Sequence, residues 1–526
     1  MRRKNRDYPF YEHTYINNLK ELIELRYKEQ PNDIAFSWIE DSNKITKTYK
    51  DFYEDCNNIS NYYYKNYKND HIGIIGENSY DWLVHFFGII LSGNVAVIFD
   101  KDCGEELFKT LMKKTDTKII VYSKEYVDYI EKLKYKSLNL HDINSYIKEG
   151  KKLNNKHVID NNELACIFFT SGTTGANKGV MLSNENIAFD IYSLSSIFRP
   201  DGNVVSVLPF NHTFGLITAV LKPFYYGVEV FINSSLKYVL RDLKNEKPDT
   251  LFVVPTFIET FYKQIWKIAR STKKDKILKS SIKVSNGLNK VGIDLRKQLF
   301  KSVTNAFGGN LHWIICGGAY LDIKYVKWFR SIGIEILNGY GITECSPVIS
   351  VNRNEFYRDG SIGHVGKDQD VKIIDDEICV KGKNVMLGYY GDKKATKEVI
   401  IDGYFHTGDL GRLDENNFLY MTGRKKNLII LSNGENVSPE EIEASLMKDE
   451  AVVECVVFDK DNKIIASIYP SDEYMGDQEY FDNLIYEYNK DKPKNRQIAL
   501  VLLRTEEFIK NNNKKILRNK VMEEYK

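Results

Sequence analysis

Cysteine is scarce in this sequence, and so is charge of one sign. Seven cysteines are scattered over 526 residues, without a C-x-x-C pair or close histidines at metal-ligand spacing. This distribution argues against a disulfide framework and a structural zinc site. The 74 Lys and Arg nearly balance the 72 Asp and Glu. The whole chain therefore has no electrostatic driving force toward nucleic acid or anionic membranes, although a local patch is compatible with this balance.

Long apolar runs are also missing. The apolar stretch from Leu83 to Phe99 contains polar residues and Gly93, and it falls short of the roughly 20 apolar residues that a membrane span needs. The basic start at residues 1–6 is not followed by the uninterrupted apolar region of a signal peptide. We therefore expect no integral membrane segment, no nucleic-acid partner and a cytoplasmic location.

The order of the apolar runs predicts an α/β fold. With 43% hydrophobic and 28% charged residues, the composition is globular, and the length allows two to four domains at roughly 150 residues each. Helical spacing alternates with short apolar runs over 15–123 and again over 204–338, which predicts two doubly wound parallel sheets. The expected strands are 71–75, 95–99, 204–208, 250–254 and 313–316.

The sequence pattern changes after Gly360. Short alternating strands and turns predict a small β-barrel-like subdomain over about residues 360–425. The basic stretch Arg424-Lys425-Lys426 then precedes a last segment of about 100 residues. We expect a large N-terminal domain over 1–425 and a small α+β C-terminal domain over 426–526.

The most informative segment runs from Thr170 to Gly179. Its three glycines let the backbone turn tightly and present N–H groups to an anion, its hydroxyls add donors, and Lys178 adds a cation. This composition suits a polyphosphate. It is not a Walker A loop, because that spacing is absent and residues 179–182 have the pattern of a strand where a P-loop starts a helix. For the segment alone, a Ser/Gly-rich surface turn is the alternative.

This loop resembles the phosphate loop of the adenylate-forming (AMP-binding) enzymes, which include acyl-CoA synthetases, peptide-synthetase adenylation domains and firefly luciferase. Further blocks follow in that family's order. Residues 208–215 resemble the block beside the acyl site, 317–319 and 338–344 the adenine-binding pair, 404–409 and 423–424 the ribose-binding blocks, and 510–518 the terminal block. The resemblance implies that ATP or AMP is bound by Thr170, Ser171, Gly172, Thr173, Thr174, Gly175, Lys178, Gly317, Gly318, Ala319, Asn338, Gly339, Tyr340, Gly341, Asp409 and Arg424.

The side chains of these blocks suit those roles. Tyr340 offers a flat face to a purine, Thr343 a hydroxyl to phosphate, and Glu344 a hard carboxylate oxygen of the kind Mg²⁺ prefers. Asp409 can accept hydrogen bonds from both ribose hydroxyls, and Arg424 can reinforce ribose or phosphate binding. Each residue alone has an ordinary alternative, such as a surface glutamate or a helix-capping aspartate. Their joint occurrence in the family's order favours the functional interpretation.

Lys515 is implied as the catalytic lysine. Lys510, Lys514 and Lys520 lie close to it, and such a cluster is usually a solvated face. Alignment of Ile516 and Arg518 with the family's terminal block matches Lys515 to the lysine that neutralises charge on the α-phosphate and the acyl carboxylate. With Thr343 and Glu344 it completes the expected catalytic set. The sequence departs from the family in Asn177, Asn184, Asn511 and Lys514, which puts loop stiffness and lysine placement in doubt.

Two further roles are implied by the resemblance. His212, with Phe214 and Gly215, matches the lining of the tunnel to the acyl site, where the histidine moves aside for a thiol; a satisfied core histidine is the alternative. Lys426 matches the hinge about which the small C-terminal domain rotates between half-reactions; a solvated linker charge is the alternative.

The blocks at 340–350 and 431–443 look most like those of bacterial long-chain fatty acyl-CoA ligases. The implied reaction consumes ATP with Mg²⁺, forms an acyl-adenylate, and passes the acyl group to coenzyme A or to the phosphopantetheine of a separate carrier protein. No covalent nucleophile is needed, which fits the lack of a G-x-S-x-G elbow or a recognisable Cys/His pair. The chain ends soon after Lys515, so we expect a free-standing ligase.

Three functions stay open from the sequence. They are a fatty acyl-CoA ligase, a ligase that loads a fatty or aryl acid onto an acyl carrier protein, and a nucleotide-binding protein without catalysis, suggested by Asn177 and Lys514.

Overall fold

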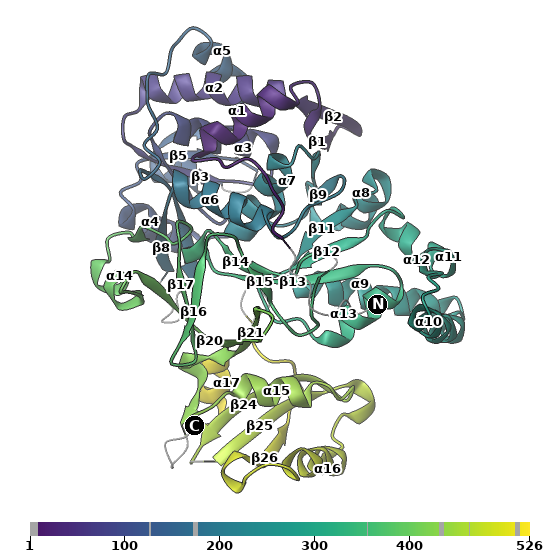
Figure 1. The fold of residues 1–526 in the computed structure, drawn as a ribbon. Helices are drawn as coiled ribbons and strands as arrows, with labels where there is room; N and C mark the ends of the chain where they lie inside the picture. The colour runs from purple at the N-terminus through teal and green to yellow at the C-terminus, as the bar shows by residue number, and fades with distance from the viewer. Residues whose placement is uncertain are drawn as a thin grey trace. The chain divides into compact units, whose positions relative to one another are not determined.

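A computed structural model describes residues 9–125, 128–171, 177–354, 356–430, 436–461, 463–510 and 516–525. The chain forms two compact units, each described by itself below. The first contains residues 1–371, 380–405 and 415–418, and the second contains 372–379, 406–414 and 419–526. Figure 1 traces the chain through both.

The larger sheet of the first unit has a parallel centre and antiparallel edges. Parallel pairing runs from β13 through β12, β11, β9 and β10 to β1, whereas β2 at one edge and β14 and β15 at the other pair antiparallel (Figure 1). In spatial order the strands are β15 (Gly363–Val365), β14 (Val348–Val351), β13 (Glu335–Gly341), β12 (Trp313–Cys316), β11 (Thr250–Val253), β9 (Val204–Ser206), β10 (Val230–Ile232), β1 (Ile34–Glu40) and β2 (Asn43–Thr48).

A second sheet of the first unit is parallel from β7 through β4, β3 and β5 to β6. Its other edge is antiparallel, because β7 and β8 form a hairpin and β18 adds to β8. In spatial order the strands are β18 (Gly388–Tyr389), β8 (Asn177–Ser183), β7 (Leu164–Ser171), β4 (Val95–Ile98), β3 (His71–Ile75), β5 (Ile119–Tyr122) and β6 (Lys136–Asn139).

Helices connect these strands, as the predicted α/β alternation requires. The apolar stretch from Leu83 to Phe99 divides into the end of α3 and the strand β4. Within the described ranges, no helix combines the length and apolarity needed to cross a bilayer. The helices are α1 (Leu19–Glu29), α2 (Tyr49–Asn66), α3 (Tyr80–Leu91), α4 (Glu105–Lys114), α5 (Ile143–Gly150), α6 (Asn184–Ser195), α7 (Lys222–Tyr225), α8 (Val239–Glu246), α9 (Pro255–Ser271), α10 (Asp275–Lys290), α11 (Arg296–Leu299), α12 (Lys301–Thr304), α13 (Ile323–Ser331) and α14 (Lys393–Val399).

The second unit combines short β-strands with an α+β C-terminal part. Strands β16, β17, β20 and β21 pair in that order. Strands β24, β25 and β26 form a separate sheet that packs against its own apolar core. The elements are β16 (Asp370–Ile374), β17 (Glu377–Lys381), β19 (Ile400–Ile401, in the first unit), β20 (Tyr404–Leu413), β21 (Phe418–Arg424), β22 (Ile429–Ile430), β23 (Asn436–Val437), α15 (Pro439–Leu446), β24 (Val452–Lys460), β25 (Lys463–Pro470), α16 (Gln478–Asn489), β26 (Ile498–Leu503) and α17 (Arg518–Glu524).

The predicted fold class is confirmed, and the predicted strands are present with ends that differ by at most two residues. The membership of the sheets differs from a simple division by chain order. Strand β1, from the N-terminal alternating segment, pairs with β10, and the β7–β8 hairpin joins the sheet of β3 and β4. Local periodicity predicts a strand but not its partner, because pairing depends on contacts between distant segments.

Candidate active site

The predicted phosphate loop begins in β7 and ends in β8. Thr170 pairs with Lys178 and Ser171 with Asn177 across the antiparallel ladder. The strand expected after the loop is confirmed as β8, so this segment does not have the strand-to-helix geometry of a P-loop. Gly172, Thr173, Thr174 and Gly175 lie outside the described residues.

Lys178 and Glu344 both contact Tyr389. The Nζ atom of Lys178 lies 4.4 Å from the ring centroid of Tyr389, and the Tyr389 hydroxyl donates a hydrogen bond of 2.9 Å to Oε1 of Glu344. Burial and the nearby Glu344 carboxylate raise the pKa of Tyr389, so the phenol keeps its proton and acts as a donor. Sequence analysis missed Tyr389, because it reaches the site through the pairing of β18 with β8.

The two predicted adenine-binding blocks follow neighbouring parallel strands. Cys316 at the end of β12 is in register with Asn338 on β13, so Gly317 and Gly318 follow one strand where Asn338 and Gly339 continue the other. The carboxyl ends of parallel strands are the usual ligand-binding edge of α/β sheets. The Oδ1 atom of Asn338 is buried without a hydrogen-bond partner in the described part of the chain, which makes it suited to accept a hydrogen bond from an amino group of a ligand.

Thr343 and Glu344 lie in a short turn at residues 343–345 that is adjacent to β8. The hydroxyl of Thr213 donates to that of Thr343 over 3.5 Å, which connects this turn to the predicted acyl-site block. Gly341 precedes the turn, and a Cβ atom there would lie 2.1 Å from the Pro347 carbonyl oxygen. The close approach of these two backbone segments therefore requires glycine at position 341.

Of the predicted tunnel residues, Phe214 and Gly215 begin a π-helix over Phe214–Leu221, and His212 lies just before it. Helices of this kind are rare and occur frequently at functional sites. A Cβ atom on Gly215 would lie 2.1 Å from the Pro209 carbonyl oxygen, so the π-helix can begin this close to the preceding turn only with glycine there. Burial lowers the pKa of His212, although the negative charge of Asp100 acts in the opposite direction. The lowered pKa favours the neutral imidazole. The tunnel role of His212, Phe214 and Gly215 stays a prediction.

In the second unit, the two predicted ribose-binding residues form an ion pair. Asp409 on β20 is opposite Arg424 on β21 in the strand register, and the Arg424 Nε lies 2.9 Å from Asp409 Oδ1. Asp409 is 2% exposed. The structure places a buried carboxylate, fixed by an arginine, at the position where the sequence predicts a ribose acceptor.

A buried glutamate orders the turn that carries Asp409. Both carboxylate oxygens of Glu377 are engaged, since Oε1 accepts the Gly408 N–H at 2.7 Å and Oε2 lies 3.0 Å from Lys425 Nζ and 3.1 Å from His406 Nδ1. Although burial opposes it, hydrogen bonds from His406, Lys425 and Gly408 hold the pKa of Glu377 below its usual value. Glu377 was missed by sequence analysis because its partners come from a different strand.

The same cluster contains a Cys/His pair that the sequence did not reveal. Cys379 Sγ lies 3.4 Å from Nδ1 of His406, and together with Glu377 these residues offer three possible metal-ligand atoms within 4.8 Å of one another. Burial and Glu377 raise the pKa of Cys379 to about 11, which opposes a thiolate nucleophile. Because the Glu377 oxygens already accept from Lys425, His406 and Gly408, the cluster is explained as a support for the Asp409 turn.

We expect Glu377→Gln to destabilise the β17–β20–β21 region at pH 7 by about 1.5–3 kcal/mol, the usual contribution of hydrogen bonds to a charged group. A carboxyl group with a lowered pKa stabilises the folded state above its unfolded pKa, near 4.5, and this stabilisation is lost as the pH falls through the folded pKa. The difference between wild type and variant should therefore shrink below about pH 4.5. Hydrogen exchange at β20 and β21, normalised for intrinsic rates, measures it.

Glu450→Gln is the matched control, because Glu450 is exposed and has no hydrogen bond or ion pair within the described ranges. It should leave exchange at β20 and β21 unchanged at every pH. A constant difference between wild type and Glu377→Gln from pH 7 to pH 4 would contradict the charged network.

The described residues on either side of 511–515 pair with each other. Lys510 and Ile516 make a β-bridge, and the Leu517 N–H donates to the Ile509 carbonyl at 2.9 Å. Lys510 is paired with both Glu454 and Glu507, and Lys520 with Glu523. These pairings explain two of the four clustered lysines as structural. Lys514 and Lys515 lie outside the described residues.

Known protein families and curated proteins match this chain over most of its length. The sequence profile of the AMP-binding enzymes matches residues 23–390, and that of the AMP-binding enzyme C-terminal domain matches residues 426–526. The chain is 28% identical over 445 residues to a long-chain-fatty-acid–CoA ligase, ACSBG2, of Rattus norvegicus, with 72% of this chain and 65% of that protein covered. It is also 28% identical over 496 residues to a long-chain-fatty-acid–[acyl-carrier-protein] ligase, AEE15, of Arabidopsis thaliana, which covers 76% of this chain and 68% of that protein.

The chain thus spans about two thirds of the length of these curated relatives. Among solved structures, the o-succinylbenzoate CoA synthetase of Bacillus subtilis, in complex with its acyl-adenylate intermediate, has a TM-score of 0.74 at 21% identity. The match covers 95% of this chain and 97% of that one. At this identity the similarity shows a shared fold.

Proposed function

Because the chain belongs to the family of AMP-binding enzymes, we propose that it is an ATP-dependent acid–thiol ligase that forms an acyl-CoA. The observation that carries the proposal is the cluster of Lys178, Tyr389 and Glu344. It brings together a cation suited to phosphate, which belongs to the predicted phosphate loop, and a carboxylate suited to a divalent metal, both in contact with one tyrosine.

The reaction has two balanced steps. A carboxylate oxygen of the acid attacks the α-phosphorus of ATP, the bond to the β-phosphate oxygen breaks, and pyrophosphate leaves with that electron pair. The sulfur of the thiol then attacks the carbonyl carbon of the acyl-adenylate, AMP leaves with its phosphate oxygen, and the thiol proton passes to solvent. The activation resides in the mixed anhydride, so no side chain needs to form a covalent intermediate.

The proposed residue roles follow from position and charge. Lys178 binds the phosphates, and Asn338 Oδ1, buried without a partner within the described ranges, accepts the adenine amino group. Gly317, Gly318, Ala319, Gly339 and Tyr340 frame the base. Asp409 and Arg424 bind the ribose hydroxyls, and Lys515 stabilises the charge that develops on the α-phosphate.

A magnesium ion fits the oxygen donors of the turn at 343–345. Glu344 supplies a carboxylate and Thr343 a hydroxyl, both of them ligand types that Mg²⁺ accepts. When bound, the ion would neutralise phosphate charge. In the protein, the Tyr389 hydroxyl orients the Glu344 carboxylate by its hydrogen bond to Oε1.

We propose a medium- or long-chain fatty acid as the substrate and coenzyme A as the acceptor, supported by the similarity to the rat long-chain-fatty-acid–CoA ligase. The Arabidopsis relative supports a second candidate, transfer to an acyl carrier protein. Purified protein with ATP, Mg²⁺ and a panel of alkyl and aryl acids should produce thioester with coenzyme A. Thioester formed only on a phosphopantetheinylated carrier protein would support the second candidate instead.

We expect Lys426→Pro to separate the two half-reactions. Lys426 lies in a single 3₁₀ turn over Lys425–Asn427, directly after β21, and proline there would fix its φ near −65° and disfavour the helical conformation of Lys425. If Lys426 is the hinge, adenylate formation should persist while thioester formation from preformed adenylate falls. The control Lys426→Ala removes the charge but keeps the backbone free, so it should retain both half-reactions. Equal losses in both half-reactions for Lys426→Pro would rule out the hinge.

A further inference from the structure

One face of helix α10 packs against the rest of the first unit. It packs against α9 and α13, with Leu278 and Ser285 buried. The Ser285 hydroxyl donates to the Ser331 carbonyl oxygen at 3.5 Å. This face therefore belongs to the apolar core that also contains Trp266 and Phe329.

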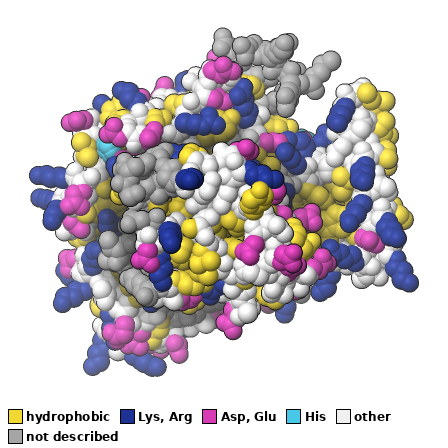
Figure 2. Space-filling model, turned by 90° about the horizontal axis from the view of Figure 1, so that it is seen from below, with side chains coloured by type: hydrophobic (Ala, Val, Ile, Leu, Met, Phe, Trp, Pro, Cys, Tyr) yellow, Lys and Arg dark blue, Asp and Glu magenta, His cyan; other side chains and the backbone are white. Residues whose placement is uncertain are grey.

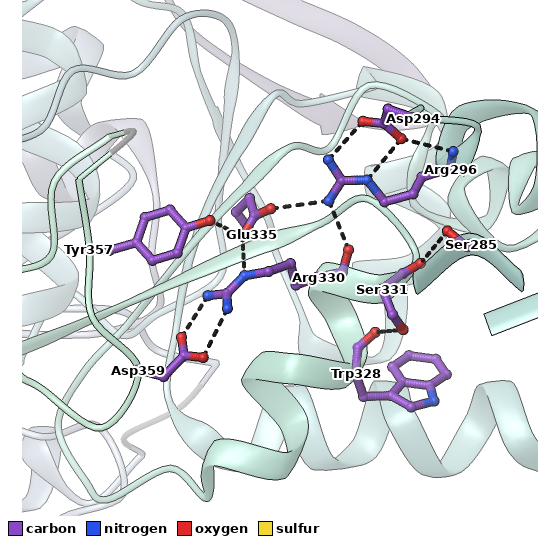
Figure 3. Close-up of polar contacts among 9 residues, drawn as sticks. All are labelled: Ser285, Asp294, Arg296, Trp328, Arg330, Ser331, Glu335, Tyr357 and Asp359. Carbon is purple, nitrogen blue, oxygen red and sulfur yellow. Dashed lines mark hydrogen bonds and ion pairs between the residues drawn. The ribbon is translucent and has the colours of Figure 1, made fainter. Parts of the chain in front are cut away.

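The segment after α10 is held by a charge network around the buried Glu335 (Figure 3). Glu335, at the start of β13, lies between two arginines: Arg296 Nη1 is 3.2 Å from its Oε1 and Arg330 Nε is 2.7 Å from its Oε2. Arg330 also forms a two-pronged ion pair with Asp359. Leaving the buried Glu335 unpaired would be costly, so this network favours the observed position of Arg296, which follows α10 in the chain.

The exposed side of α10 carries a seven-residue repeat, whose last member, Val291, directly follows the helix. A lysine is followed directly by a β-branched apolar residue at 276–277, 283–284 and 290–291. Seven residues are about two turns of an α-helix, so the three dipeptides line up along one face. The apolar members are strongly exposed, Ile277 to 62%, Val284 to 54% and Val291 to 72%. Between them the row contains only small residues, Ser280 and Gly287.

This face lies in the most basic part of the first unit. Residues 255–304 contain twelve lysines and arginines against three acidic residues, a net charge of +9 in a chain whose total is +2. None of Lys276, Lys283 and Lys290 takes part in an ion pair in the described part of the chain. Figure 2 shows dark blue and yellow side chains next to each other on the lobe at the right, where Figure 1 places α10 and α11.

We propose that this lysine–apolar face of α10, formed by the three dipeptides, docks on the surface of an anionic phospholipid bilayer. The positively charged lysines are attracted to the negatively charged membrane surface. Their long side chains let the ammonium groups reach the headgroups while Ile277, Val284 and Val291 enter the boundary of the acyl region. Because α10 is already folded and packed against α9 and α13, the helix does not have to fold when it docks.

The charges disfavour a second copy of this chain as the occupant. Lys276, Lys283 and Lys290 form one row, and two such faces in contact would oppose like charges without acidic partners from α10, whose acidic content is Asp275 alone. The exposed apolar residues equally favour lipid over a purely polar anionic partner, because they would gain nothing from phosphate contacts.

The test is flotation of the full-length protein with vesicles of phosphatidylcholine alone or mixed with phosphatidylglycerol. The wild type should float with the anionic vesicles and not with the neutral ones, and added salt should release it. The triple variant Lys276→Gln/Lys283→Gln/Lys290→Gln should lose about 100-fold in partitioning, the effect of three lysines near a charged surface. The triple variant Ile277→Ser/Val284→Ser/Val291→Ser should also bind more weakly.

A matched control removes the same charge elsewhere. Lys148, Lys151 and Lys152 are exposed at the end of α5, and their triple replacement by Gln should leave flotation unchanged. Equal loss in both lysine variants, or wild-type binding that does not depend on phosphatidylglycerol, would overturn the proposal. Sedimentation velocity on the same proteins supplies the other decisive outcome, because a dimer abolished by the serine variant would assign this face to a second copy.

Discussion

Lys515→Ala is expected to slow acyl-adenylate formation by about 10²–10³-fold while ATP binding changes little. A cation that acts on charge developing at the α-phosphate contributes mainly to the transition state, and removing one electrostatic stabiliser of this kind typically has an effect of this size. The measurement is the rate of pyrophosphate exchange at saturating acid, together with the ATP dissociation constant.

The neighbouring lysines supply the controls. Lys510 forms ion pairs with Glu454 and Glu507. The variant Lys510→Ala should therefore lower the stability of the fold around residue 510 without a comparable loss in the rate of adenylate formation. Lys514→Ala tests the alignment directly, because Lys514 stands where the family has glycine. Full activity of Lys515→Ala with loss of activity in Lys514→Ala would show that the alignment is shifted by one residue.

Asp409→Ala should raise the Michaelis constant for ATP by about 10–100-fold with a smaller effect on the turnover number. The ribose hydroxyls are bound in the ground state and the transition state alike, so the loss is of uniform binding. Hydrogen bonds to a charged acceptor contribute about 1.5–3 kcal/mol. The measurement is the Michaelis constant for ATP at saturating acid and thiol.

A nucleotide analogue separates ribose binding from structural damage. Removing Asp409 also leaves Arg424 without the carboxylate at 2.9 Å, so lower stability alone could weaken binding. With 2′,3′-dideoxy-ATP, wild type should lose affinity while Asp409→Ala should show little further loss, because the partner hydroxyls are already missing. Equal penalties in the two proteins would remove Asp409 from the ribose site.

The sequence predicts the parts of the fold that local pattern determines. Short apolar runs predicted the strands β3, β4, β9, β11 and β12, and the residues after the Thr170–Gly179 loop were correctly expected as a strand, which is β8. The pairing of β1 with β10 and the position of β18 beside β8 were not predicted. Both depend on contacts between segments far apart in the chain, which periodicity does not encode.

The candidate site divides in the same way. Residues within recognisable blocks, such as Glu344 and Asp409, were found from their order in the chain. Their supports, Tyr389 and Glu377, were missed because each comes from a strand far away in the sequence and acts through a hydrogen bond to another segment. The outward face of α10 carries a repeat visible in the sequence, but its exposure and its anchoring through Glu335 required the structure.

The most direct test of the proposed chemistry is exchange of labelled pyrophosphate into ATP with Mg²⁺ and a panel of acids, in the absence of any thiol. An enzyme that forms an acyl-adenylate should exchange label only when its acid is present, and Lys515→Ala should exchange far more slowly. Addition of coenzyme A should then convert the acid to a thioester with release of one AMP. Exchange that is absent with every acid, or that proceeds without one, would contradict the account.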